Sequence, residues 1–134
     1  MKTIISFLLL IFIFSCSAPK EEQLKKQVKR YASVIKVKPE KLDYYKELHA
    51  NPWPEVNAML KECNIQNYSI YYRDGLLFSY LEYTGNNFEA DMKKMAADPM
   101  TQKWWKETDP CQEPVESAEE GEWWAGLEEV YHLE

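Results

Sequence analysis

The stretch NYSIYYRDGLLFSYLEYT, residues 67–84, decides the fold that this sequence predicts. Its first half alternates with the period of two that a strand requires, which places three side chains on one face: Tyr68, Ile70 and Tyr72. The dipeptide Asp74-Gly75 follows, and Asp-Gly is typical of tight hairpin turns because both central residues take a positive φ there. Residues 76–84 return as the partner strand, so the middle of the chain predicts an antiparallel hairpin.

The segment before the hairpin predicts a strand and two helices. KRYASVIKV, residues 29–37, is rich in β-branched and aromatic residues and is interpreted as the strand. Pro39 suits the first turn of a helix, because its missing N–H would have no partner there. This helix cannot pass Pro52, and a second helix from Pro54 carries apolar residues at helical spacing: Val56, Met59, Leu60 and Cys63.

The segment after the hairpin predicts two more helices and a last strand. The first helix is expected where apolar residues recur at helical spacing: Phe88, Met92, Met95 and Ala96. Asp98-Pro99 is typical of the N-cap and first turn of a further helix, which contains TQKWWKE, residues 101–107. Residues 109–122, rich in Pro, Glu, Ser and Gly, predict a surface loop, and LEEVYHL, residues 127–133, predicts a closing strand.

This order of elements is strand, helix pair, strand, strand, helix pair, strand. It predicts an α+β fold on the ferredoxin-like βαββαβ plan, in which the helices cover only one face of the sheet. The other face is too rich in aromatic residues to stay in water, and a second copy of the same sheet would cover it. We therefore expect a homodimer in which two sheets form a dimeric α/β barrel.

The first residues of the chain predict export. Residues 1–15 consist of a basic start and an apolar run that is shorter than the about 20 residues of a membrane-spanning helix. Cys16 stands where a lipoprotein signal peptide would be cut, so we expect its lipidation and a polar tether over residues 16–27; an ordinary secretory signal is the alternative. The domain would occupy residues 28–134, exported and lipid-anchored to a bacterial membrane, on its periplasmic side or at the cell surface.

Composition disfavours several classes of protein. The chain has 22 acidic against 16 basic residues and no basic stripe, which disfavours nucleic acid as a partner. Its four glycines are scattered, so they form no phosphate-binding loop, and no spacing of Cys, His and carboxylates resembles a metal site; we expect neither metal nor cofactor. Beyond Cys16, only Cys63 and Cys111 remain, and the sequence leaves open whether they pair.

The stretch DYYKELHANPWPEV, residues 43–56, carries the candidate site. Tyr45 and His49 lie one turn apart on one helix face, so both side chains can reach one ligand. Histidine exchanges a proton near neutral pH without a large shift of its pKa. The proline-flanked corner at residues 51–54 ends the helix next to His49, where a pocket can open. From spacing alone, a histidine on an apolar helix face is more often an ordinary core residue, so core packing of His49 stays open.

Two pairs of tryptophans add aromatic surface elsewhere in the chain. They are Trp104 with Trp105 and Trp123 with Trp124. Aromatic faces pack against the C–H faces of sugars, while phenol and indole groups bond to sugar hydroxyls. The sequence therefore favours a small sugar pocket, although a tandem tryptophan pair also fills dimer interfaces.

Five ordered pieces of the chain, between about Arg30 and Leu133, resemble the L-rhamnose mutarotase family. They are YYKELH, WPEV, NYSIY, QKWWKETDP and GEWWAGLEEVYHL. The resemblance implies an isomerase of carbohydrate and rhamnose metabolism that interconverts the α and β anomers of L-rhamnose or a related deoxy sugar. It also implies a dimeric ferredoxin-like barrel without metal or cofactor. A lipid-tethered sugar-binding module without turnover is the alternative function.

The resemblance also implies roles for particular residues. His49 matches the family's catalytic proton donor, and four residues match substrate-binding positions: Tyr45, Tyr68, Trp104 and Trp105. Ring opening of a sugar needs an acid at the ring oxygen and a base at the anomeric hydroxyl. The sequence leaves the base open between Tyr45, Tyr68 and a bound water.

Overall fold

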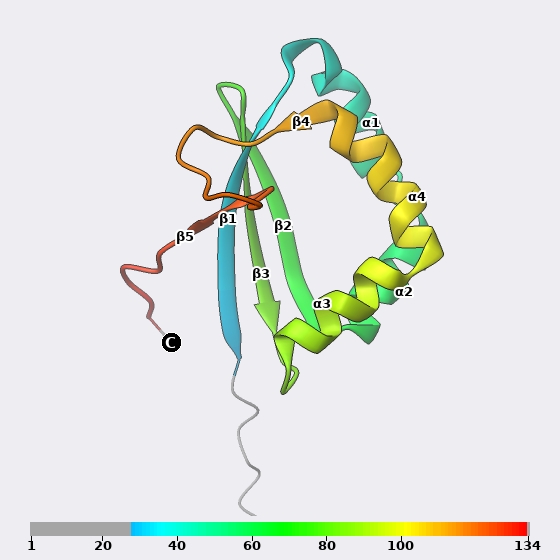
Figure 1. Cartoon of the computed structure of the whole chain (residues 1–134), viewed down its shortest axis with the longest axis vertical. Helices are drawn as coiled ribbons and strands as arrows, with labels where there is room; N and C mark the ends of the chain where they lie inside the picture. The colour runs from blue at the N-terminus through cyan, green and yellow to red at the C-terminus, as the bar shows by residue number, and fades with distance from the viewer. Residues whose placement is uncertain (1–27, 134) are drawn as a thin grey trace, which may run out of the picture.

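The computed structural model describes residues 28–133, in which one curved antiparallel sheet is covered on a single face by α-helices (Figure 1). The strands are β1 (Lys29–Val37), β2 (Ile65–Arg73), β3 (Leu76–Tyr83), β4 (Gln112–Glu113) and β5 (Ala125–Leu127). The helices are α1 (Leu42–Ala50), α2 (Pro54–Glu62), α3 (Phe88–Ala97) and α4 (Pro99–Thr108), with short 3₁₀ turns at η1 (Pro39–Lys41) and η2 (Asp109–Cys111).

The strand order confirms the predicted α+β fold of the ferredoxin-like plan. The strands lie in the order β2-β3-β1-β4, and β5 also pairs with β1. All pairs are antiparallel, with the β2–β3 hairpin turning at Asp74 and Gly75, whose φ values of 49° and 82° are those a tight turn needs. β1 therefore lies in the middle of the sheet and holds its two halves together.

The predicted closing strand over residues 127–133 is wrong in position. β5 covers Ala125–Leu127, and residues 128–133 form no strand. β4 lies inside the segment predicted as a loop, because Gln112 pairs with Val37 at the end of β1. The free edge of β1 is thus divided between two short strands, with β5 pairing to Ala32–Val34. The chain then runs away from the sheet toward its C-terminus (Figure 1).

The start of α4 follows the predicted Asp98 cap, and α3 has an N-cap at Asn87 that was not predicted. Asp98 accepts a hydrogen bond from Thr101 N at 2.7 Å, and Asn87 accepts one from Ala90 N at 3.1 Å. Pro54 and Pro99 stand in the first turns of α2 and α4, where no backbone N–H is needed. The Asp98 cap fixes where α4 begins, and α4 together with α1 carries the candidate site.

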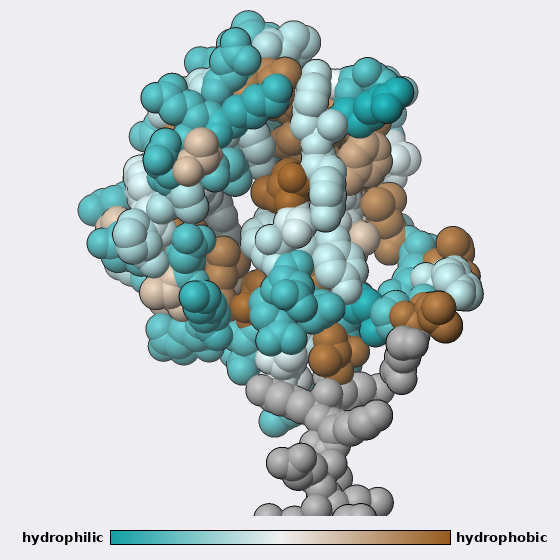
Figure 2. Space-filling model, turned by 180° about the vertical axis from the view of Figure 1, so that it is seen from behind, coloured by the Kyte–Doolittle hydropathy of each residue, from teal (hydrophilic) through white to brown (hydrophobic). Residues whose placement is uncertain are grey.

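Two clusters of buried side chains fill the space between helices and sheet. One joins α1 to the sheet through Ile35, Val37, Tyr45, Leu77 and Cys111. The other joins α2 and α3 to β2 through Cys63, Ile65 and Met95. Cys63 and Cys111 are both buried and free, which settles the open question of their pairing. Seen from behind, the domain is hollowed between the two layers (Figure 2).

The sheet face away from the helices carries a row of apolar side chains. Val34 pairs with Phe78 and with Ala125, and Phe78 pairs with Tyr71, so these residues lie side by side across the sheet. Their neighbours Ile35 and Leu77 point into the core, and successive side chains of a strand point to opposite faces. Tyr71 is 63% exposed, so this face of the single chain is partly open to water.

Gly85 is expected to be essential for stability. A Cβ there would overlap the hydroxyl of Tyr83, which is fully buried, donates to Asp91 Oδ2 at 2.6 Å and accepts from Asn87 N at 3.0 Å. We expect Gly85→Ala to lower the free energy of unfolding by about 1–3 kcal/mol, as overpacking does. Urea denaturation measures the change.

The matched control is Gly126→Ala. A Cβ at Gly126 would meet only Glu122 Oε1 at 3.5 Å, which is ordinary van der Waals contact. We expect this variant to unfold at nearly the wild-type urea concentration. Equal stability of the two variants would show that the Tyr83 hydroxyl does not constrain position 85.

Candidate active site

The last turns of α1 place Tyr45 and His49 together, as their spacing predicts. Nδ1 of His49 lies 2.8 Å from the carbonyl oxygen of Tyr45, and the two rings stack with centroids 4.1 Å apart. A carbonyl oxygen can only accept, so Nδ1 must carry the hydrogen. Nε2 is then the one ring nitrogen of His49 that is left to exchange a proton with a ligand.

Further aromatic rings enclose the imidazole. The ring of Trp104, from α4, meets His49 edge-on with centroids 5.2 Å apart. Trp53, from the corner between α1 and α2, meets Trp104 in the same manner at 5.3 Å. His49 itself is half-buried, so it is not sealed within the core. Trp53 was not predicted as a site residue, although it stands in the proline-flanked corner that the sequence singles out.

Burial sets the charge of His49. Desolvation lowers the pKa of His49 below its usual value of 6.5, and the hydrogen bond to the Tyr45 carbonyl opposes that shift only in part. The imidazole is therefore neutral at pH 7. In the neutral form, Nδ1 keeps its hydrogen and Nε2 presents a lone pair.

The phenols of Tyr45 and Tyr68 lie close enough to influence each other. Burial raises the pKa of Tyr45 well above its usual value, and the nearby phenol of Tyr68 raises it further. Burial of its hydroxyl raises the pKa of Tyr68 to about 12, although 41% of the residue as a whole is exposed. Both phenols stay protonated at neutral pH, so both can donate a hydrogen bond and neither serves as a ready base.

The two predicted tryptophans have different environments. Trp104 is 7% exposed and faces His49, whereas Trp105 is 37% exposed. Consecutive residues of a helix point about 100° apart, because the helix has about 3.6 residues per turn. Among the described ring contacts, Trp105 makes none with His49 or Tyr45, so its predicted contact with a sugar stays a prediction.

Gln112 is the polar site neighbour that the sequence did not reveal. Its Nε2 donates to the hydroxyl of Tyr45 at 3.3 Å, and its Oε1 accepts from Trp123 Nε1 at 3.2 Å. The side chain is 4% exposed. No local signal marks this glutamine, because it lies in a segment that resembles a surface loop and is buried only through the pairing of β4 with β1.

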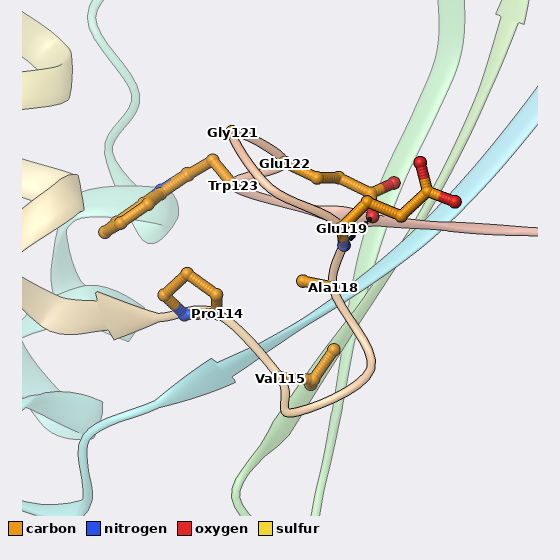
Figure 3. Close-up of a pocket in the computed structure, with 7 residues that line it drawn as sticks. All are labelled: Pro114, Val115, Ala118, Glu119, Gly121, Glu122 and Trp123. Atoms are coloured by element: carbon orange, nitrogen blue, oxygen red, sulfur yellow. Dashed lines mark hydrogen bonds between the residues drawn. The ribbon is translucent and has the colours of Figure 1, made fainter.

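The loop between β4 and β5 holds a shallow pocket of its own (Figure 3). Glu122 connects two parts of this loop, because its carboxylate accepts hydrogen bonds from Glu119 N at 2.9 Å and from Gly126 N at 2.7 Å. In Figure 3 the ring of Trp123 points away from the carboxylates of Glu119 and Glu122. No predicted site residue lines the pocket, whose walls are Pro114, Val115, Ala118, Glu119, Gly121, Glu122 and Trp123. This pocket is therefore separate from the candidate site around His49.

Residues 28–133 contain no group of three or more His, Cys, Asp or Glu side chains that could hold a metal ion. The groups that do meet around His49 are the phenol ring of Tyr45 and the indole of Trp104.

Comparison with known proteins identifies the family. The family model described as L-rhamnose mutarotase matches residues 30–133. The L-rhamnose mutarotase of Oceanobacillus iheyensis is 33% identical over 109 residues, which cover 80% of this chain and all of that protein. The L-rhamnose mutarotase of Bacillus subtilis is 38% identical over 85 residues, which cover 62% of this chain and 79% of that protein.

Solved structures agree with this match. The crystal structure of L-rhamnose mutarotase FA22100 from Formosa agariphila superposes with a TM-score of 0.63 at 25% identity, covering 79% of this chain and 99% of that one. Tetracenomycin F2 cyclase from Streptomyces glaucescens superposes with a TM-score of 0.59 at 11% identity, covering 79% and 97%. At that identity the cyclase shares only the fold.

The prediction of an exported, lipid-anchored protein is wrong. The matching relatives are named L-rhamnose mutarotases, and none of those reported is named as a lipoprotein or an exported protein. Residues 1–27, which carry the predicted signal peptide, Cys16 and the tether, lie outside the described residues. Within residues 28–133, no helix has the length and apolar character to cross a membrane.

The family match and the coverage of the relatives confirm the resemblance that the five ordered motifs indicate. The match over residues 30–133 spans the helices that carry His49, Tyr45 and Trp104. The chain belongs to the L-rhamnose mutarotase family.

Proposed function

We propose that the protein interconverts the α and β anomers of L-rhamnose, and that His49 moves the proton. The observation that carries the proposal is the hydrogen bond from His49 Nδ1 to the Tyr45 carbonyl, which leaves Nε2 as the exchanging nitrogen. L-rhamnose is proposed as the substrate because the relatives are named L-rhamnose mutarotase.

Anomers of a free pyranose exchange through the open-chain aldehyde. The hydroxyl on C1 loses its proton, the bond between C1 and the ring oxygen O5 breaks, and O5 gains a proton. Rotation about the C1–C2 bond turns the aldehyde over, and reclosure by the reverse steps gives the other anomer. The reaction therefore needs a group that accepts a proton at O1 and a group that donates one at O5.

His49 can serve both needs in sequence. Its neutral Nε2 accepts the proton of the O1 hydroxyl, and the imidazolium then gives a proton to O5. The Nδ1–H bond to Tyr45 is compatible with both charge states, so the ring does not have to turn. The family resemblance implies that His49 is a proton donor, and this role corresponds to the second step, in which the imidazolium protonates O5. Positioned proton transfer of this kind contributes about 10²–10⁴-fold.

The phenols and indoles would hold the sugar. Tyr45 and Tyr68 keep their protons at neutral pH, which makes them donors to the oxygen on which negative charge develops. Trp104 and Trp53 offer aromatic surface for the C–H face of the ring and the C6 methyl group. A site that accepts the C6 methyl group rejects an extra hydroxyl there only modestly, so we expect activity on related sugars.

A homodimer follows from the uncovered face of the sheet. The row from Tyr71 through Phe78 to Val34 is apolar, and Leu127 beyond it is 44% exposed. A second copy of the same sheet would remove this row from water in a self-complementary contact. We propose that two chains associate through this face as a dimeric α/β barrel. Each chain would then have its own site around His49.

Replacing the imidazole should abolish catalysis without unfolding the chain. In His49→Asn the amide N–H can replace the Nδ1–H bond to Tyr45, but nothing replaces Nε2. We expect kcat for anomer exchange to fall by about 10²–10⁴-fold, as measured by NMR saturation transfer between the two anomers.

The control for this variant is His132→Asn, in the exposed segment after β5. It should exchange anomers at the wild-type rate. Full activity in His49→Asn would remove His49 from the mechanism. If the wild-type protein bound the sugar without speeding its equilibration, a non-catalytic sugar-binding role would be favoured instead.

The pH dependence should have an acid limb. Because burial lowers the pKa of His49 below 6.5, the neutral imidazole dominates above that pH and is lost as the pH falls through its pKa. We expect kcat/KM to be level from about pH 7 upward to pH 8 and to fall with a midpoint below the usual histidine value. A rate that falls as the pH rises from 6 to 8 would contradict the starting role of Nε2 as a base.

A further inference from the structure

A chain of hydrogen bonds connects the loop between β4 and β5 to the site. Trp123 Nε1 donates to Gln112 Oε1 at 3.2 Å, and Gln112 Nε2 donates to the Tyr45 hydroxyl oxygen at 3.3 Å. Gln112 and Tyr45 are 4% and 3% exposed, so water has little access to compete for these bonds. The chain is buried except at its Trp123 end.

The chemistry of the three groups fixes the direction of each bond. An indole N–H can only donate, so the amide oxygen of Gln112 must face Trp123 and the amide nitrogen must face Tyr45. The Tyr45 oxygen therefore accepts from Gln112. A phenol has one hydrogen, and that hydrogen must point away from Gln112.

Tyr45 is also the residue on which His49 depends. Its carbonyl accepts from His49 Nδ1, and its ring stacks on the imidazole. The bond from Gln112 thus holds the far end of the ring against which His49 lies. A donor on the phenol oxygen also polarises the O–H bond, because hydrogen bonds in a chain strengthen one another.

We propose that Gln112, backed by Trp123, is a positioning residue that orients Tyr45 so that its phenol donates its hydrogen to the sugar. This inference rests on the proposed mutarotase function and adds a residue outside the ring cluster to it. Gln112 touches neither the sugar nor His49, and it acts only through the Tyr45 oxygen. The Tyr45 O–H is then aimed at the oxygen that becomes negative as the ring opens.

A double-mutant cycle tests this dependence. Gln112→Met keeps the length of the side chain and removes both hydrogen bonds, while Tyr45→Phe removes only the phenol oxygen. We expect Gln112→Met to lower kcat/KM about tenfold in the wild-type background, the value of one well-placed hydrogen bond. In the Tyr45→Phe background the same change should have less than about a twofold effect, because no phenol is left to orient.

Reversing the bond gives an independent test. In Gln112→Glu the carboxylate still accepts from Trp123 but can no longer donate to Tyr45, so the phenol O–H turns toward it. We expect a loss of kcat/KM at least as large as in Gln112→Met. The control is Gln102→Met, at an exposed glutamine of α4 whose amide bonds only to the Ala96 carbonyl, and its rate should match wild type.

A second readout does not depend on turnover. The affinity of the four proteins of the cycle for L-rhamnose, measured by titration calorimetry, should show the same coupling between positions 45 and 112. Equal losses from Gln112→Met in both backgrounds would make the glutamine merely structural and overturn the inference, while the mutarotase function would stand. A wild-type protein that neither binds L-rhamnose nor exchanges its anomers would overturn both.

Discussion

One hydrogen bond constrains the candidate site: Nδ1 of His49 donates to the carbonyl oxygen of Tyr45, 2.8 Å away. It joins two residues one turn apart in α1, and His49 is the last residue but one of that helix. The bond fixes the tautomer and the plane of the imidazole together. The availability of Nε2 follows from this bond, and the neutral charge of His49 follows from its partial burial.

The fold serves to hold that histidine at the edge of a core. Tyr45 packs among Ile35, Val37 and Leu77 of the sheet, so the residue that binds His49 is itself fixed. α1 stops at the proline-flanked corner, and His49 next to it is half-buried. α4 begins at the Asp98 cap and brings Trp104 to the opposite side. The candidate site is thus built from the last turns of α1 and the middle of α4, over the sheet.

Patterns within short stretches of the sequence predicted the features that depend on residues close together in the chain. The hairpin was predicted from the alternation of side chains and from Asp74-Gly75, and the contact of Tyr45 with His49 was predicted from their helical spacing. Pairings between distant segments could not be predicted. β4 was missed because two residues carry no period, and the closing strand was misplaced because the edge of β1 decides where β5 ends. Gln112 was not predicted as a site neighbour for the same reason, since it is buried where β4 pairs with the edge of β1.

The central claim is that His49 rests neutral with its hydrogen on Nδ1 and its lone pair on Nε2. The most direct measurement is ¹⁵N NMR of histidine-labelled protein at pH 7, with His49 assigned by its loss in His49→Asn. The account predicts the shift of a protonated nitrogen at Nδ1 and of a bare nitrogen at Nε2. A hydrogen on Nε2 at that pH, in either the other tautomer or the imidazolium, would contradict it.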